Sequence, residues 1–175
     1  GSGGDSLECG VSNAATSQNS SAVGSGNTAS ADFSQAFGGN NQATGLASTA
    51  VGRSNQALGE RSTAIGSLSA AEGDFSLAIG NSDSSATGAR VEAGATNGIA
   101  IGRASAVSVN AVNGISLGAS SRAAANNSTA IGLSALADGV SSLALGHGAN
   151  ASELNSVALG QGSVADAANT VSVGA

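Results

Sequence analysis

The sequence repeats a short pattern at a fixed spacing from one end of the chain to the other. The pattern is clearest at Ser62-Thr63-Ala64-Ile65-Gly66, and each copy closes with a glycine. Nine of the eleven intervals between these marker glycines are 14 residues long, and the other two are 22 and 16 residues long. Self-similarity at a fixed period is typical of solenoid-like arrays, so each repeat is expected to form one coil. The marker glycines are Gly10, Gly24, Gly38, Gly52, Gly66, Gly80, Gly102, Gly118, Gly132, Gly146, Gly160 and Gly174.

A flexible linker is the alternative that the composition suggests, because only 9% of the 175 residues are charged and Gly, Ser and Ala are abundant. The strict placement of the aliphatic residues excludes it. The absence of Pro fits a chain whose N–H groups are needed for hydrogen bonds between strands. A net charge of −6 without any Lys argues against a nucleic-acid surface or an anionic membrane surface. We expect neither a membrane-spanning segment nor a signal peptide in this stretch.

Each regular coil contains two short segments that are expected to be strands. The first reads S-x-A-h-G, where h is aliphatic, as at 48–52, and the second reads A-x-G or similar, as at 43–45. Because side chains alternate between the two faces of a strand, Ser, Ala and Gly share one face of the first segment. Ala and Gly likewise share one face of the second segment. The two strands can face each other only through very small side chains, which predicts a flattened all-β roll with a thin interior.

The other face of the first segment carries an aliphatic stripe. Stacked at about 4.8 Å per coil, its side chains would form a continuous apolar surface on the outside of the roll. Burying each Val, Ile or Leu contributes roughly 1.5–3 kcal/mol, so leaving them all in water is untenable for a soluble monomer. Identical copies of the chain are the simplest partner for this face. The predicted interface residues are Val23, Phe37, Val51, Ile65, Leu77, Ile79, Ile99, Ile101, Ile115, Leu117, Ile131, Leu143, Leu145, Val157, Leu159, Val171 and Val173.

The single cysteine, Cys9, occupies the position that Val, Ile, Leu or Phe fills in the other coils. One cysteine excludes an internal disulfide framework. We expect a small, buried, apolar side chain. Its thiol is expected to be free and poorly reactive, because this position should exclude water and disfavour the thiolate.

Two intervals depart from the 14-residue spacing. The segment 81–97 holds about eight extra residues and shows no clean second strand; it includes Asp83, Arg90 and Glu92, which are candidate ligand-binding residues. Insertions in repeat arrays map to loops on one face, often the binding face, but a surface bulge without a role is the alternative. The segment 103–113 adds two residues, and we expect it to distort the second strand locally.

Two aromatic residues, Phe33 and Phe75, each follow a marker glycine by nine residues, so they are expected at the same corner of the roll, three coils apart. They are candidate ligand-binding residues, because aromatic side chains dominate binding hot spots. Alternatively, each covers a seam with a neighbouring protomer.

No group of residues indicates a catalytic, cofactor or metal site. The only histidine, His147, lies between two glycines in an expected turn, and a lone histidine makes neither a metal site nor a triad. The Gly-rich turns lack the phosphate-binding pattern G-x-x-x-x-G-K-[ST]. We therefore expect a protein that is not an enzyme and that uses no cofactor.

Two of the repeats carry a resemblance to a known family. Asn155-Ser156-Val157-Ala158-Leu159-Gly160 and Asn127-Ser128-Thr129-Ala130-Ile131-Gly132 resemble the N-S-V-A-I-G repeat in the YadA-like heads of trimeric autotransporter adhesins. The S-x-A-x-G that follows in that family appears here as Ser69-Ala70-Ala71-Glu72-Gly73. The resemblance covers 6–174 and implies a homotrimer of left-handed parallel β-rolls, each a solenoid of about twelve 14-residue coils. Val157 and Leu159, with their equivalents in the other coils, would then face the trimer axis.

Some positions depart from that pattern: Glu8, Ser116 and Ser172 stand where the small inward Ala is usual. We expect 1–175 to be a single β-roll head, taken from a longer protein, in which 1–4 are an added tag. The stalk, neck and membrane anchor of a full-length member are not in this stretch. We therefore expect contact with the membrane only through the C-terminal anchor of the full-length protein, which is not in this stretch.

The resemblance implies a non-enzymatic adhesin head exposed on the bacterial outer membrane, with a role in virulence. Its expected partners are host extracellular matrix proteins or cell-surface receptors, with autoagglutination and haemagglutinin-like behaviour as further expectations. The alternative is a structural spacer that projects another binding domain from the cell surface. An ice-binding array would need a regular Thr grid, which Thr49, Thr63 and Thr129 do not form, and an acyltransferase β-helix would show a six-residue period.

Overall fold

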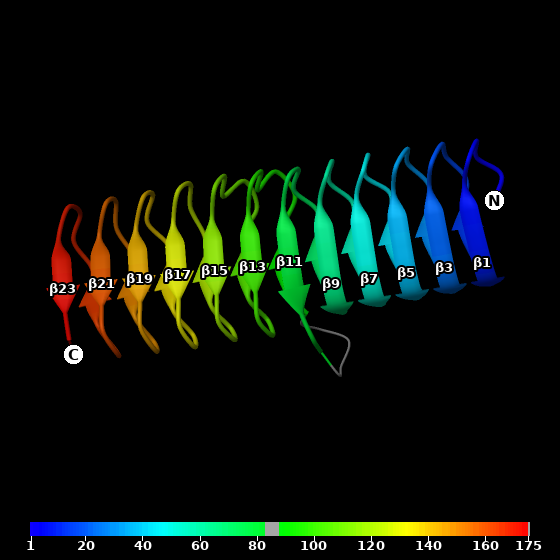
Figure 1. Ribbon diagram of the computed structural model, residues 1–175. Coiled ribbons are helices and arrows are strands. Elements are labelled where there is room, and N and C mark those ends of the chain that lie inside the picture. The colour runs from blue at the N-terminus through cyan, green and yellow to red at the C-terminus, as the bar shows by residue number, and fades with distance from the viewer. Residues whose placement is uncertain (83–87, 175) are drawn as a thin grey trace.

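The computed structural model describes residues 1–82 and 88–174, which form an all-β parallel solenoid of about twelve coils (Figure 1). Each regular coil contributes one strand to each of two sheets, and no helix occurs in the described residues. The first sheet contains twelve strands: β1 (Leu7–Val11), β3 (Ser21–Ser25), β5 (Gln35–Gly39), β7 (Thr49–Arg53), β9 (Thr63–Ser67), β11 (Leu77–Gly80), β13 (Ile99–Ile101), β15 (Ile115–Leu117), β17 (Thr129–Ile131), β19 (Leu143–Leu145), β21 (Val157–Leu159) and β23 (Val171–Val173).

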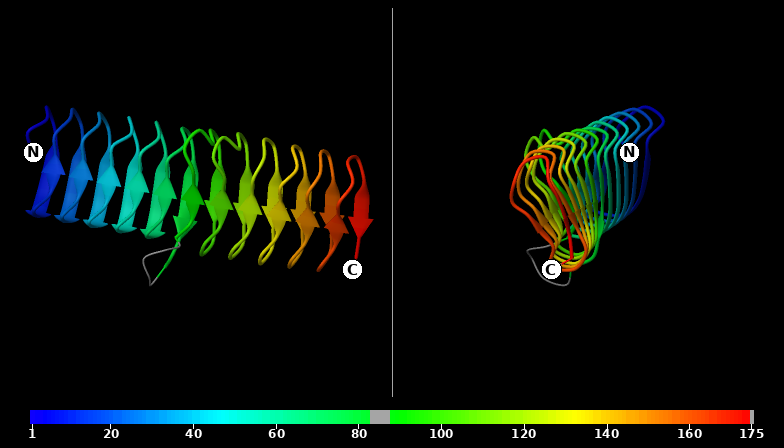
Figure 2. Two further views of the ribbon diagram at one scale, coloured as in Figure 1. Left: turned by 180° about the vertical axis from the view of Figure 1, so that it is seen from behind. Right: turned by 90° about the vertical axis from the view of Figure 1, so that its left-hand side faces the viewer.

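The second sheet contains eleven strands of two residues each: β2 (Ala14–Ala15), β4 (Thr28–Ala29), β6 (Gln42–Ala43), β8 (Gln56–Ala57), β10 (Ala70–Ala71), β12 (Arg90–Val91), β14 (Ala106–Val107), β16 (Arg122–Ala123), β18 (Leu136–Ala137), β20 (Asn150–Ala151) and β22 (Val164–Ala165). The coils stack along one axis, and the two termini lie at opposite ends of it (Figure 2). The predicted solenoid is confirmed.

The strands of neighbouring coils pair in parallel at equal positions of the repeat. Val51 pairs with Ile65, and Leu77 pairs with Ile99 across the 22-residue interval. The unusual inward residues keep this register, since Ser116 pairs with Ala100 and Ser172 pairs with Ala158. Equal positions of the repeat therefore form straight rows along the solenoid.

Alanine from both sheets fills the interior. The alanines of the two segments are fully buried in the regular coils, as at Ala50 and Ala57 (both 0% exposed). The serine that opens the first segment is buried beside them, and Ser34 Oγ donates to the carbonyl oxygen of Ala31 at 2.6 Å. Burying a methyl-sized group contributes about 0.8 kcal/mol, so the hydrogen-bond ladders between coils are important for stability. The face assignment made from the sequence is confirmed.

The marker glycine is required by close stacking. Gly52 has φ +120°, a conformation that residues with a Cβ rarely adopt, and an added Cβ would overlap the carbonyl oxygen of Gly66 in the next coil. The chain therefore leaves the first sheet at a position where only glycine fits.

The corner that leads into each first-sheet strand has a residue in the left-handed conformation. Asn occupies this position in several coils, as at Asn127 (φ 57°), because Asn tolerates it well. Phe33 (φ 59°) and Phe75 (φ 54°) occupy the same position, which confirms that they share a corner.

The insertion is smaller than the sequence suggested. The expected loop 81–97 is wrong in its second half, because Arg90 begins β12 and this strand pairs with β10 and β14. A second strand is therefore present in this coil, although the sequence showed none. Asp83 lies outside the described residues.

The extra two residues of 103–113 do not distort the second strand, contrary to expectation. They lie in the turn after β14, whose Val107 pairs in register with Val91 and Ala123. Val91 and Val107 are fully buried where other coils have Ala. Gly98 and Gly114 stand where the other coils have the buried serine that opens the first segment. A Cβ added to Gly98 would lie 2.6 Å from Cγ1 of Val91, and one added to Gly114 would lie 2.6 Å from Cγ1 of Val107. In these two coils the larger Val on one side of the interior is therefore accommodated by the smaller Gly on the other side.

Candidate functional surfaces

The aliphatic stripe of the first sheet is the longest apolar surface of the chain. Every predicted interface residue lies on a first-sheet strand, and the register aligns them into two rows. Eleven steps between coils give the stripe a length of about 50 Å. Its residues are half-buried or exposed in the single chain, as at Ile65 (36%), Ile101 (37%) and Leu159 (40%). Its side chains therefore still have apolar surface to bury.

The expectation that Cys9 is buried is wrong for the single chain, in which this residue is exposed. Its position in the stripe is confirmed, because Cys9 pairs with Val23. The side chain lies on the outer face of the first sheet, where no other described residue of the chain buries it.

An asparagine ladder, formed by Asn13, Asn27, Asn41 and Asn55, lies just inside the corner at which the chain leaves the first sheet. Asn41 Nδ2 donates to the carbonyl oxygens of Phe37 (2.9 Å) and Gly52 (2.8 Å), and to Oδ1 of Asn27 (3.0 Å). The amides of Asn27, Asn41 and Asn55 each link three successive coils in this way, and that of Asn13 links the first two. The sequence analysis missed this ladder, although four Asn residues at 14-residue spacing were a visible signal.

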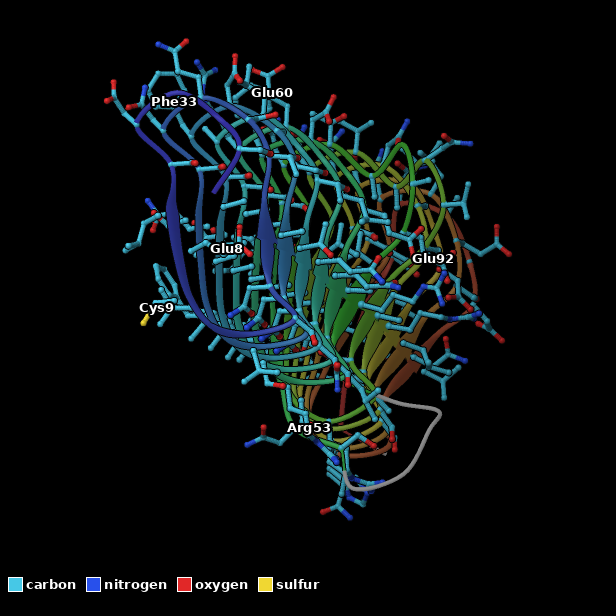
Figure 3. All side chains as sticks on the ribbon, turned by 90° about the vertical axis from the view of Figure 1, so that its right-hand side faces the viewer. Glu8, Cys9, Phe33, Arg53, Glu60 and Glu92 are labelled. Carbon is cyan, nitrogen blue, oxygen red and sulfur yellow. The ribbon has the colours of Figure 1, made fainter. Side chains whose placement is uncertain are left out.

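We name the two corners of the solenoid by their place in Figure 1. The upper corner leads into the first-sheet strands, as at 58–61 and 72–75, and the lower corner leaves them, as at 53–54 and 103–104. Figure 3 shows Phe33 and Glu60 at the upper corner and Arg53 at the lower corner. Most carboxylates lie at the upper corner or beside it on the second sheet, whereas the described residues of the lower corner carry none.

Arg90 and Glu92, which were candidate ligand-binding residues, are paired within the chain. Arg90 contacts Glu72 at 3.0 Å and Glu92 at 3.6 Å on the outer face of the second sheet. A similar pair joins Arg122 to Asp138 at 2.8 Å. Each of these side chains thus has a partner of opposite charge within the chain, and the ligand-binding role of Arg90 and Glu92 remains only a prediction.

The two candidate aromatic residues are exposed at the upper corner. Phe33 is 54% exposed and Phe75 is 48% exposed. The guanidinium of Arg61 lies 5.5 Å from the ring centroid of Phe75 and also contacts Glu60 at 3.2 Å. Both side chains are accessible to a ligand and to a neighbouring protomer, so both of the sequence-based readings stay predictions.

Two hollows flank the coil that contains the insertion. One, of about 350 Å³, lies on the side of the second sheet between Gln56 and Arg90. The other, of about 480 Å³, lies at the lower corner and is lined by Arg53, Ser67, Asn81, Ser82 and Arg103. Both are accessible from the surface, and the second is the more open of the two.

The described part of the chain contains no group of three or more His, Cys, Asp or Glu that could hold a metal ion. His147 is exposed between its two glycines. Nor do residues 1–82 and 88–174 include a helix long and apolar enough to cross a membrane. The stripe, the two corners and the second sheet are the candidate functional surfaces.

Comparison with known families gives one match. The model described as YadA head domain repeat (2 copies) matches 15–41, 34–55, 43–69, 57–82, 110–135, 137–163 and 151–175, which together cover more than half of the chain. No curated protein matches. Among solved structures, the crystal structure of the collagen-binding domain of Yersinia adhesin YadA is similar, at 28% sequence identity and a TM-score of 0.47. The match covers 95% of this chain and 69% of that one.

Proposed function

The chain belongs to the family of YadA head domain repeats, and from this premise we propose that it is a head segment that works as a homotrimer on the bacterial surface. The family is one of non-enzymatic adhesins, and an adhesin-type function follows for the chain. The proposal adds the number of copies and the partners, which are host extracellular matrix proteins or cell-surface receptors. Autoagglutination would follow if heads on neighbouring cells bind one another.

The observation that carries the proposal is the aliphatic stripe. It runs along the whole solenoid, it lies on one sheet only, and its residues, Ile65 and Ile101 among them, are still partly exposed. Removing apolar surface from water contributes about 25 cal/mol per Å², and a stripe about 50 Å long offers a large area. Copies that turn this face to a common axis would bury all of it.

Assembly through the first sheet would leave the second sheet and both corners facing outward. Those surfaces repeat in every coil and carry polar side chains together with exposed apolar ones, such as Leu133 and Val164, so each copy would present the same sites to a partner. Three copies in one head, and many heads on one cell, raise effective concentration, so weak contacts can give firm attachment.

The test measures binding of the chain to immobilised matrix proteins, with collagen as one probe. Wild type is compared with Ile65→Asp, which should not assemble. Loss of three-point attachment should weaken apparent binding by about 10²–10⁴-fold. Thr44→Asp is a matched control, because Thr44 is exposed on the outward side beside β6 and does not belong to the stripe.

If wild type binds neither matrix proteins nor cells although it assembles, the adhesive role is contradicted. The structural spacer would then be the better reading, because a regular solenoid suits that role equally well. Equal binding by wild type and an unassembled Ile65→Asp variant would contradict the multivalent mechanism.

A further inference from the structure

In the part of the chain that the structure describes, the two arginines of the lower corner have no carboxylate partner. Among the described residues, three arginines have carboxylate partners, whereas Arg53 and Arg103 have none. Arg53 makes only a long contact of 3.4 Å from Nη2 to Ser67 Oγ. The two exposed arginines flank the hollow of about 480 Å³, which is otherwise lined by the small polar side chains Ser67, Asn81 and Ser82. Among the described residues, the lining of this hollow is therefore cationic, although the chain as a whole is acidic.

The upper corner carries a net negative charge at the same heights along the solenoid, because Glu60 and Asp74 outnumber Arg61, which contacts Glu60 at 3.2 Å. Arg53 ends β7 and Arg103 follows β13, so the two arginines are three coils apart, or about 14 Å. Glu60 precedes β9 and Asp74 precedes β11, so both carboxylates lie at heights between the two arginines. Asp74 is exposed, and the Glu60 side chain is 40% exposed.

A ring of copies brings unlike corners together. When copies surround an axis parallel to the solenoid and turn their first sheets toward it, each copy places its lower corner beside the upper corner of the next. Such a contact joins two different surfaces, and it closes into a ring. Because rotation about the axis changes no height, residues at equal heights meet.

We propose that the lower corner of each copy binds the upper corner of a second copy of this chain, with Arg53 and Arg103 opposite Glu60 and Asp74. The proposal rests on the trimer proposed above and adds which surfaces meet at each seam, and so how far each copy is turned about its own long axis. Opposite charges at equal heights favour this alignment and disfavour like-to-like contacts. Phe75, beside Asp74 on the same corner, would enter the hollow and lose its exposed surface.

The test reverses the charge of each corner separately and then of both together. The variants are Arg53→Glu with Arg103→Glu, Glu60→Lys with Asp74→Lys, and all four changes in one chain. Their dissociation is followed by sedimentation over a dilution series at low salt, with far-UV circular dichroism as the check on folding. Arg122→Glu is the control, since it reverses one charge on the outer face of the second sheet.

Each separate reversal places like charges at every seam. We expect it to raise the concentration of half-dissociation at least tenfold, and 1 M salt to reduce the difference because exposed charges are screened. The fourfold variant restores opposite charges and should dissociate within about threefold of wild type. The control should not differ from wild type.

An unchanged trimer after either reversal, or a fourfold variant as weak as its parents, would overturn the corner contact while leaving the trimer intact. A cationic-corner variant that keeps the trimer but no longer binds a sulfated polysaccharide would assign this corner to a polyanion and equally overturn it. A wild-type chain that sediments as a monomer would overturn the trimer itself, and the corner contact with it.

Discussion

The N-terminal and C-terminal halves of the solenoid differ in how the chain turns at the lower corner, where it leaves the first sheet. In the N-terminal coils, from β1 to β9, the first-sheet strands have five residues, whereas those from β13 to β23 have three. The N-terminal coils contain the asparagine ladder, and the corresponding positions of the C-terminal coils hold Ser or Ala, as at Ser121 and Ala135. Asn and the longer strands therefore occur together.

The hydrogen bonds explain this association. The backbone N–H of Asn41 donates to Oδ1 of Asn27 in the preceding coil, at 3.0 Å. At the same position, the N–H of Ala135 donates to the carbonyl oxygen of Gly132 in its own turn, at 3.3 Å. A side chain in the neighbouring coil holds the corner extended in one half, and a tight turn closes it in the other. Coupling between coils should be stronger in the N-terminal half.

The largest expected effect concerns what the two halves share, which is the aliphatic stripe. Ile65→Asp and Ile131→Asp each place three carboxylates near one axis, and each buried charge costs several kcal/mol unless it is protonated. Both variants should lose the trimer or aggregate, as measured by light scattering. If only one of them does so, the assembly interface is confined to one half.

The next effect should separate the halves. Asn41→Ala removes the amide and leaves the carbonyl oxygen of Gly52 and the N–H of Asn55 without their partners. Unsatisfied buried groups cost about 1–3 kcal/mol each, so the free energy of unfolding should fall by about 3 kcal/mol. For a chain of this size that lowers Tm by roughly 6–12 °C.

The matched change in the C-terminal half is Ser121→Ala. Its hydroxyl donates to the carbonyl oxygen of Gly118 at 2.9 Å and contacts Ser116 Oγ at 2.7 Å. One or two ordinary hydrogen bonds contribute about 1 kcal/mol net, so thermal unfolding should shift about a third as far. Equal shifts for the two variants would contradict the difference in coupling.

An effect smaller than that of Asn41→Ala is expected where the two halves meet. Val107→Ala removes two buried methyl groups and leaves a cavity beside Gly114, so it should cost about 2 kcal/mol. Adding Gly114→Ser restores the Ala and Ser pair of the regular coils and should recover part of the loss, as measured by chemical unfolding. No recovery would show that the two-residue turn after β14, and not the packing, sets the shape of this coil.

The smallest effect should follow removal of the insertion. Excising 82–87 joins Asn81 to Gly88, and β11 and β12 already pair in register with their neighbours on both sides. We expect an unchanged trimer and unchanged matrix binding. Loss of binding with the trimer intact would assign adhesion to this loop instead of to the repeating surfaces.

The sequence predicted the solenoid, the faces of its strands and the stripe, because a fixed period and side-chain alternation determine them. It also placed Phe33 and Phe75 at one corner. The sequence did not predict the strand at Arg90, because Arg90 and Val91 do not match the A-x-G pattern of the second segment. Only the register with neighbouring coils identifies this strand. The ion pairs of Arg90 and the unpaired state of Arg53 depend on which coils stack, and no spacing along the chain encodes that directly.

The central claim is that the aliphatic stripe is an interface between copies of this chain. Multi-angle light scattering of the unmodified chain, over a range of concentrations, tests it most directly. The account predicts a particle of three times the 16.2 kDa of the single chain. A particle of 16.2 kDa at every concentration, with the stripe open to water, would contradict it.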